Sequence, residues 1–439
     1  MAHVSHIDTA TVFAMFCAQH FLPNEDGRVA FVLPRSVMAG ATQHKNFREG
    51  RAAFLYAPVA ALDLDAVEPL FRIPASVMIF DKVEREGKPE VPWQWPTRAL
   101  AGQLPRKNAD RSEADAALTE SEGEAATPTS PSPYVAQTQQ GADMRPRAFC
   151  IVEADPSAKV LDRQQPYLRS DSQAVADADP AWRGVSIDGR VEARFLYATS
   201  LRVDPFRIGP LRLAALPIEG NDKGEVEVLQ QEEILARGHA GMARWLAHAE
   251  EEFRAVLEKT EREWKGTVVD YLNTQSKLGR QKPLAHRVVW GKGGTHIRAA
   301  VPPSGIAEAQ GLPVHGYIID LSCYGVVCAS QDEAHYLCAV LNSTTAGDAI
   351  AYHQTRGEQG RRDIHRRPVQ HVPIPVFDHG NRKHSRLAEL SLEAHSTALS
   401  VPFDSRYRAE RYREALGEPL REIDRLANEV LQAAYRDAT

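Results

Sequence analysis

Helical and strand-like segments alternate over the first 85 residues and then stop, and this pattern constrains the fold more than any other feature. Residues 8–22 and 36–49 are typical of helices. Residues 28–33 (RVAFVL), 52–57 and 75–80 (ASVMIF) are short apolar runs, which favour strands, the first of them buried on both faces. The alternation indicates an α/β fold. The strands are too few for a complete doubly wound sheet, so we expect the chain to begin inside a domain.

The segment after this alternation has a different composition. Residues 109–143 are rich in Ala, Glu, Ser, Thr and Pro, with a core that reads SEGEAATPTSPSPY. Such a segment buries little apolar surface, which predicts a linker or a disordered insertion. The region 147–218 then has short strand-like runs at 149–152, 191–198 and 211–218, separated by Gly, Pro and Asp.

The second half of the chain alternates between helical and strand-like patterns. A long helix is predicted over 228–265, because six large apolar residues recur at spacings of seven and four: Leu235, Met242, Leu246, Phe253, Leu257 and Trp264. Gly238 and Gly241 weaken its first turns, so the secure part is Met242–Trp264. Strands are predicted within 285–300 and 314–328, a helix from residue 331 to 342, and helices over the last 55 residues.

Charge is unevenly distributed along this acidic chain. The formal net charge is −6, which argues against indiscriminate binding to nucleic acid. Residues 107–145 have a net charge of −4 and residues 225–264 of −5. Residues 265–300 carry seven Lys or Arg and one Asp, and residues 351–371 carry five Arg against two acids. These two basic segments are either local surfaces for a polyanion or ordinary solvated faces.

Several classes of protein do not fit the composition. With 43% hydrophobic and 25% charged residues, the chain is neither wholly disordered nor fibrous. It has no apolar run of about 18 residues and no secretory signal at its start. Its five cysteines are irregularly spaced, which predicts no disulfide framework and fits a reducing cytoplasm.

Two groups of motifs resemble the family of N-6 adenine-specific DNA methylases of restriction–modification type. The first is Asn24–Val37 (NEDGRVAFVLPRSV) with the later PLFRIPASVMIFDK at residues 69–82. The second is Tyr336–Ser343 (YLCAVLNS), the run QTRGEQGRRDIHRRP at Gln354–Pro368, and His371–Val376 (HVPIPV), similar to a helix, a variable loop and a strand that end target-recognition regions. The resemblance implies that residues 1–90 are the end of a Rossmann-like methyltransferase sheet. It also implies that 91–146 is an acidic linker, 147–378 a mixed α+β target-recognition domain, and 379–439 a C-terminal helical segment.

Both catalytic signatures of that family are absent from the chain. One is the Gly-rich loop that holds S-adenosylmethionine, and the other is the Asn-Pro-Pro-aromatic motif that holds the adenine amine. The nearest strings, 301–304 (VPPS) and 179–182 (DPAW), are expected to be loops. Residues 291–294 (GKGG) lack the spacing of a phosphate-binding loop and are expected to form a tight turn that presents Lys292. Methyl transfer needs both the donor and the held base, so this chain should not methylate DNA alone.

The candidate DNA contacts lie in the two basic segments. Arginine can bind guanine edges or phosphates, and glutamine can bind adenine edges. In the second segment the candidates are Gln354, Arg356, Arg361, Arg362, Arg366, Arg367 and Gln370, unless Glu358 and Asp363 neutralise some of them. In the first segment they are Lys277, Arg280 and Lys292, with Arg298 nearby, and their expected role is to position phosphates. The alternative for this segment is a solvated linker after a long helix.

No metal site is expected, because His365 and His371 are six residues apart and Cys323 and Cys328 have no second pair. The expected partners are double-stranded DNA and a methyltransferase half or subunit with the missing motifs. The alternative is a stand-alone DNA-binding specificity protein or a truncated remnant without catalysis. RNA methylation is a weaker third reading.

Overall fold

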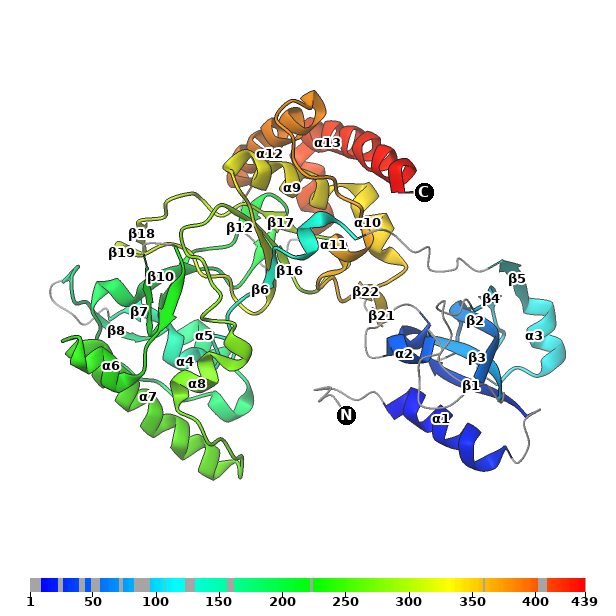
Figure 1. The fold of residues 1–439 in the computed structure, drawn as a ribbon, viewed down its shortest axis with the longest axis horizontal. Coiled ribbons are helices and arrows are strands. Elements are labelled where there is room, and N and C mark those ends of the chain that lie inside the picture. The colour runs from blue at the N-terminus through cyan, green and yellow to red at the C-terminus, as the bar shows by residue number, and fades with distance from the viewer. Residues whose placement is uncertain are drawn as a thin grey trace. The chain divides into compact units, whose positions relative to one another are not determined.

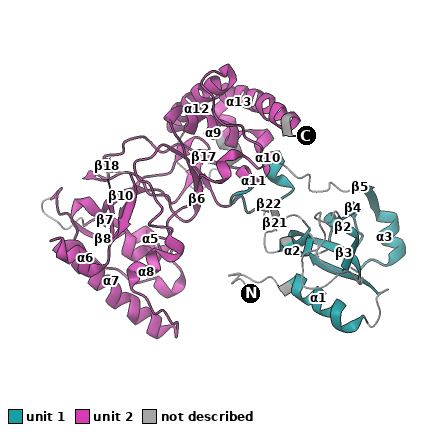
Figure 2. Cartoon of the chain, viewed as in Figure 1, with its two compact units in different colours: residues 1–129, 348–367 teal, residues 130–347, 368–439 magenta. Residues whose placement is uncertain are grey.

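The computed structural model describes residues 9–438, apart from 23–26, 39–43, 49–55, 71–73, 83–94, 107, 123–130, 156–161, 222–223, 358–359 and 402–408. The chain divides into two units (Figure 2). Unit 1 comprises residues 1–129 and 348–367, and unit 2 comprises residues 130–347 and 368–439. These boundaries differ from the expected ones after residues 90, 146 and 378. In the described part of the chain, no helix has both the length and the apolar character needed to cross a membrane.

Unit 1 is built on a five-stranded sheet with the order β1-β3-β2-β4-β5 (Figure 1). Its strands and helices are α1 (Thr9–Phe21), β1 (Arg28–Pro34), η1 (Arg35–Val37), α2 (Lys45–Arg48), β2 (Tyr56–Glu68), β3 (Ala75–Lys82), β4 (Thr97–Gln103), α3 (Arg111–Ala117), β5 (Leu118–Glu122), β21 (Thr355–Gly357) and β22 (Gly360–Arg362). Only β2 and β4 pair in parallel, and the other three pairings of the sheet are antiparallel. The expected α/β class is therefore seen as a mixed sheet, and its Rossmann-like character stays a prediction.

The first strand is covered on one face only. Exposed or half-buried residues alternate with buried ones along β1, and Val32 is 55% exposed. Val29 and Leu33 point to the core, where they join Ala14 and Ala18 of α1. The apolar run RVAFVL was expected to be buried on both faces, and that expectation is wrong, because α1 and the residues of this core cover only one side.

Part of the expected linker is folded. β4 pairs with β2 from Thr97 to Gln103, and β5 then adds the edge strand to the same sheet. Between them, α3 begins with a capping box in which Asp110 and Glu113 satisfy each other's backbone N–H groups. The expectation of a linker or disordered insertion is wrong for residues 109–122, because backbone pairing and capping order a segment with little apolar content. Residues 123–130 lie outside the described part of the chain.

Unit 2 contains two larger sheets and several two-stranded ones (Figure 1). One sheet has the order β10-β13-β7-β8-β9 and the other β17-β16-β20-β6. Their strands are β6 (Thr138–Gln140), β7 (Ile151–Ala154), β8 (Tyr167–Ser170), β9 (Asp188–Arg190), β10 (Leu196–Thr199), β13 (Arg212–Ala215), β16 (Arg287–Gly291), β17 (Ala299–Ala300) and β20 (Cys323–Val327). The smaller sheets contain β11 (Val203–Asp204), β12 (Arg207–Ile208), β14 (Ile218–Gly220), β15 (Val226–Val228), β18 (Glu308–Ala309) and β19 (Leu312–Pro313).

The remaining helices are mostly those of unit 2: α4 (Arg147–Cys150), α5 (Ser172–Ala176), α6 (Gln231–Ala236), α7 (Ala240–Lys259), α8 (Val268–Leu272), α9 (Gln331–Asn342), α10 (Thr344–Ala351), α11 (Arg367–His371), α12 (Arg382–Ser400) and α13 (Ala409–Ala438). The single helix expected over 228–265 is divided into α6 and α7. Gly238 between them has a φ of +84°, a left-handed conformation that favours glycine and ends α6. Leu235 of the expected apolar stripe is 57% exposed, whereas Met242 and Phe253 are fully buried.

The C-terminal helices pack on α9. Helix α9 covers the predicted range of residues 331–342, and Ser330 caps its first turn through the N–H of Glu333. Residues 371–376 were expected to form a strand, but the structure gives them no strand pairing. Ser132 donates instead to the carbonyl of Ile374, and Tyr336 of α9 donates to that of Pro375. Two prolines leave this segment with few backbone donors for a ladder, which explains the missing strand.

Candidate nucleic-acid interface

The Arg-rich segment of unit 1 contains a β-hairpin. β21 and β22 are antiparallel, with Arg356 opposite Arg361 and Thr355 opposite Arg362. The side chains of these three arginines lie outside the described part of the structure. After the hairpin, Asp363 and His365 both have positive φ angles, and their side chains approach to 3.5 Å. The hairpin therefore brings the backbone positions of two candidate contacts directly opposite each other.

The other candidates of this segment are less accessible. Gln354 is 3% exposed, so its side chain is not at the surface, where contact with an adenine edge requires it. Arg366, in the turn before α11, and Arg367, the first residue of α11, are both half-buried. Gln370 is also half-buried and belongs to unit 2. Of the four, Gln354 is the one whose burial argues most directly against a role in base recognition.

A buried charge cluster holds the start of this segment in unit 1. Arg35 donates from Nε and Nη2 to the carboxylate of Asp63 at 2.9 and 2.8 Å, and from Nη1 to the carbonyl of Tyr352 at 2.8 Å. The guanidinium also lies 4.8 Å from the centre of the Tyr352 ring. Burial lowers the pKa of Arg35, but the hydrogen bonds and charge of Asp63 outweigh it, so that the pKa is raised overall. Arg35 thus fixes the backbone shortly before β21.

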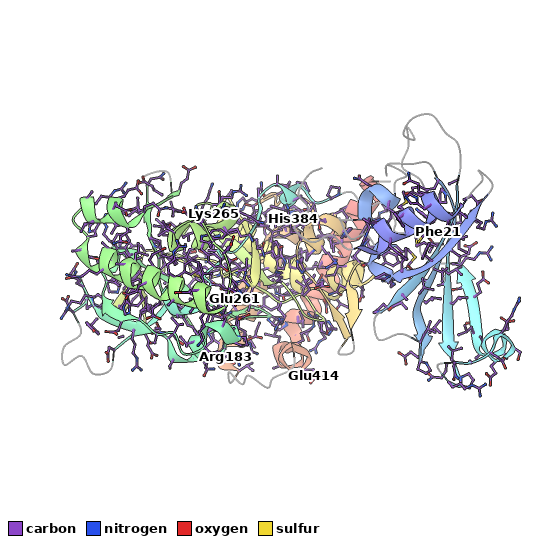
Figure 3. All side chains as sticks on the ribbon, turned by 90° about the horizontal axis from the view of Figure 1, so that it is seen from below. Phe21, Arg183, Glu261, Lys265, His384 and Glu414 are labelled. Carbon is purple, nitrogen blue, oxygen red and sulfur yellow. The ribbon has the colours of Figure 1, made fainter. Side chains whose placement is uncertain are left out.

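The basic segment of unit 2, residues 265–300, has cations without acidic partners among the described residues. Its seven basic residues are Lys265, Lys277, Arg280, Lys282, Arg287, Lys292 and Arg298. None of them forms an ion pair with any residue that the structure describes. Lys265 and Arg280 are exposed, whereas Lys277 and Lys292 are half-buried (Figure 3 labels Lys265). Other arginines of this unit are neutralised, as in the pairs Arg163–Glu308 and Arg237–Glu219.

The two turns that carry the predicted DNA contacts of this segment are both hydrogen-bonded to residues 319–322. Gln281, 1% exposed, accepts a hydrogen bond from the N–H of Ile319 at 3.2 Å, which holds the turn that contains Lys277 and Arg280. The N–H of Lys292 donates to the carbonyl of Ser322 at 2.7 Å. Both basic turns are therefore attached to residues 319–322. Residues 291–294 do not form a tight turn of their own: Gly291 ends β16 and donates to the carbonyl of Arg298 at 3.2 Å, and Gly294, with a φ of +135°, lies in the loop between them.

The two strings nearest to a catalytic motif have structural roles. Residues 301–304 form a loop, as predicted. Residues 180–182 form a short 3₁₀ helix in place of the expected loop, because Asp179 accepts from the N–H of Ala181 at 3.0 Å as its cap and Trp182 stacks on Phe253. Asp179 is already engaged with the backbone and Trp182 with the core. Neither string provides the acceptors that hold an adenine amine.

Sequence reasoning missed two buried arginines. Arg35 was read as part of a motif, with no indication of its partners at positions 63 and 352. Arg287 begins the apolar run RVVWG, and that position was the available signal, because a cation inside an apolar strand needs a partner or a ligand. Among described residues, no group of three or more His, Cys, Asp or Glu is arranged to hold a metal ion.

Comparisons with known proteins give a likeness to solved structures and no match by sequence. No protein-family model matches the chain, and no curated protein matches its sequence. Among solved structures, the chain is similar to the type IIG restriction endonuclease BpuSI, with a TM-score of 0.32 and 10% sequence identity, over 94% of this chain and 48% of that one. The chain thus spans about half the length of that enzyme, and a likeness of this size does not assign its activity.

Proposed function

We propose that this chain recognises DNA for an S-adenosylmethionine-dependent, adenine-specific DNA methyltransferase of a restriction–modification or phage-defence system. The observation that carries the DNA-binding part is the set of six exposed or half-buried cations between Lys265 and Arg298, the buried Arg287 excluded, that have no carboxylate partner among the described residues. In an acidic protein whose other arginines are largely paired, such cations are available to DNA phosphates. The motif resemblance supports the adenine-methyltransferase part.

The proposal assigns no methyl transfer to this chain by itself. Its sequence has neither a Gly-rich donor loop nor an Asn-Pro-Pro-aromatic string, and of the two nearest strings residues 179–182 are engaged in packing and capping. We therefore place the S-adenosylmethionine site in a partner half or subunit. Residues 1–90 would belong to the end of the methyltransferase domain, residues 147–378 to the recognition region, and residues 379–439 to its helical support.

Salt-dependent DNA binding tests the proposal. The variant Lys277→Ala/Arg280→Ala/Lys292→Ala removes three unpaired cations from the turns attached to residues 319–322. Each lost phosphate contact should lower the slope of log K against log salt by about 0.9, so three contacts lower it by roughly 2–3 units. Fluorescence anisotropy with a labelled duplex at several KCl concentrations measures this slope.

A matched variant removes the same charge from paired positions. Arg163→Ala/Arg190→Ala/Arg237→Ala deletes three arginines of unit 2 that face Glu308, Asp162 and Glu219. It should leave the slope close to that of the unchanged protein. Equal loss of slope in both triple variants would mean that DNA responds only to total charge, and the assigned surface would be wrong. A competition between duplex DNA and structured RNA at one salt concentration tests the alternative that the chain serves RNA methylation, which predicts a preference for RNA.

A further inference from the structure

Arg287 is a buried cation whose charge nothing in the described chain balances. It is the first residue of β16 and is 2% exposed. Its Nε donates to the carbonyl of Ala285 at 3.1 Å, but Nη1 and Nη2 have no hydrogen-bond partner. Burial lowers the pKa of Arg287 to about 10, so the guanidinium is still protonated at neutral pH. The two terminal nitrogens are therefore buried donors without an acceptor.

The neighbouring ionisable groups do not supply the missing negative charge. Tyr317 and Cys328 are the groups whose charges act on Arg287. Burial raises the pKa of the Tyr317 hydroxyl and of the Cys328 thiol, so both are neutral at pH 7. Leaving a buried guanidinium unpaired costs several kcal/mol in general, which is why buried charges in proteins are paired or bind a ligand.

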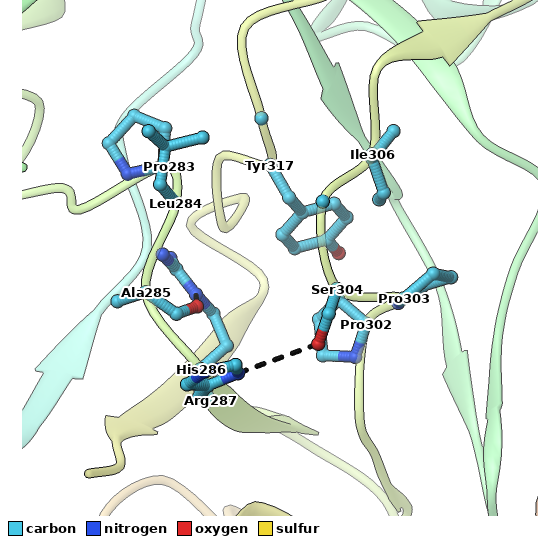
Figure 4. A pocket seen from close by; sticks show the side chains of 12 residues that line it. Pro283, Leu284, Ala285, His286, Arg287, Pro302, Pro303, Ser304, Ile306 and Tyr317 are labelled. Atoms are coloured by element: carbon cyan, nitrogen blue, oxygen red, sulfur yellow. Dashed lines mark hydrogen bonds between the residues drawn. The ribbon is translucent and has the colours of Figure 1, made fainter. Parts of the chain in front are cut away.

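Arg287 lines a pocket that opens to solvent. Figure 4 shows this pocket between the loop from Pro283 to Arg287 and the loop from Pro302 to Ile306. Its inner part has room for one water-sized group, about 20 Å³, and the space reaches about 320 Å³ only when the solvent-filled mouth is included. His286 and Ser304, both exposed, approach each other across the two loops, with Nδ1 and Oγ 3.5 Å apart. Gly316 forms one side of the pocket, and a larger residue does not fit there. Its φ is +99°, and an added Cβ would lie 2.6 Å from the carbonyl oxygen of Pro283.

The chemistry of the wall favours an anion. The lining residues, all within the described part of the chain, include no Asp or Glu. Two guanidinium N–H groups point to a ligand with two acceptor oxygens, which Arg binds in a bidentate manner. Tyr317 also lines the pocket, and its hydroxyl, which burial keeps protonated, can donate to an anion. The surrounding segment, residues 265–300, has a net charge of +6 and raises the local concentration of anions.

We infer that the pocket at Arg287 binds a phosphate oxyanion, with Nη1 and Nη2 of Arg287 as its central donors. The phosphate is either free inorganic phosphate or a phosphate of bound nucleic acid, and both present the same pair of oxygens. The inference goes beyond the proposed function, because binding of free phosphate does not require DNA.

Thermal unfolding with inorganic phosphate tests the pocket without DNA. At several times the dissociation constant of phosphate, the Tm of the full chain should rise by about 2–4 °C over KCl at equal ionic strength. Arg287→Met should abolish the rise and, in phosphate-free buffer, should be at least as stable as the unchanged protein, because it removes an unpaired buried charge. Arg163→Met, which changes an exposed arginine of the same unit, should keep the full rise.

A second variant covers the case in which Arg287→Met does not fold. Ser304→Trp places a bulky side chain at an exposed position of the rim, so it should block phosphate without lowering the Tm in phosphate-free buffer. No rise over KCl in the unchanged protein, or an equal rise in both pocket variants, would overturn the inference. In a separate DNA titration, weaker binding by the pocket variants identifies a DNA phosphate as the ligand, and unchanged binding identifies the free ion.

Discussion

Arg35 and Arg28 show how differently two arginines of the same unit can act. Both donate from two nitrogens, Nε and Nη2, to an aspartate, Arg35 to Asp63 and Arg28 to Asp81. The side chain of Arg35 is only 10% exposed, whereas that of Arg28 is 62% exposed. A buried pair is strongly destabilising when one partner is removed, because the other charge stays buried, whereas an exposed pair is screened by water.

This contrast predicts the effect of removing each arginine. Arg35→Met should destabilise unit 1 by about 3–5 kcal/mol, since Asp63 is left as an unpaired buried carboxylate. Arg28→Met should change stability far less. Hydrogen exchange on peptides from β2 and β3 measures the opening of this unit, and peptides from β21 should also exchange faster in Arg35→Met. Similar exchange in the two variants would contradict the structural role given to Arg35.

At the scale of elements, two histidines join α9 to α12. His335 lies on α9 and His395 on α12, with ring centres 5.0 Å apart. His395 bonds through Nδ1 to the carbonyl of Ser391 and accepts through Nε2 from the N–H of Val301. Because Nε2 is an acceptor, the ring is neutral. Burial, and repulsion from His395 once that ring is protonated, lower the pKa of His335 to about 3, and burial lowers that of His395 to about 4.

Acid should therefore separate these helices. The folded pKa values lie below the unfolded value of about 6.5, so the stability is complete above pH 6.5 and is lost as the pH falls toward 4. Between pH 7 and pH 5 each histidine should cost about 2 kcal/mol. Urea unfolding followed by circular dichroism at both pH values measures this loss. His335→Leu should reduce it by roughly half, and an unchanged loss would exclude His335 as a source.

The elements that sequence predicted well are those with strong local signals. Helix α9 was predicted over residues 331–342, and the structure adds that Ser330 caps it, a residue type common at that position. The break between α6 and α7 was not predicted, because the sequence does not show whether a glycine inside a periodic pattern has a helical or a left-handed φ. β4 was missed because TRALAGQ has little apolar character, and only its pairing with β2 makes it a strand. The lack of acidic partners around Arg287 in the described structure depends on which segments pack together in the fold, so no local sequence pattern could predict it.

On the scale of the whole molecule, net charge and available charge differ. The total of −6 would argue against DNA, but several arginines of unit 2 are already paired with acids. The cations between Lys265 and Arg298 form no ion pair with the described residues, so their charge remains available to a ligand. The distribution of charge among partners is therefore the property that supports nucleic-acid binding, and the sequence indicated it only as a local excess.

Reconstitution of methylation tests the division of labour in the proposed function. We expect S-adenosylmethionine-dependent methyl transfer to adenine in duplex DNA when this chain is mixed with a polypeptide that carries the Gly-rich loop and the Asn-Pro-Pro-aromatic motif. Transfer of a radiolabelled methyl group measures it, with each polypeptide alone as the control. Sequence-selective DNA binding without any methylation, across several folded partners, would favour the stand-alone specificity protein instead.

The division of the chain into units also affects its synthesis. Residues 348–367 belong to unit 1, although the 218 residues before them, 130–347, belong to unit 2. At about 5–20 residues per second, a ribosome needs roughly 10–45 s to make such a stretch. Arg35 and Asp63 emerge before this period, and Tyr352 only after it. Unit 1 can therefore complete its buried cluster only after residues 130–347 have been made, and unit 2 in turn must wait for residues 368–439. Neither unit can be completed before the synthesis of the other has begun.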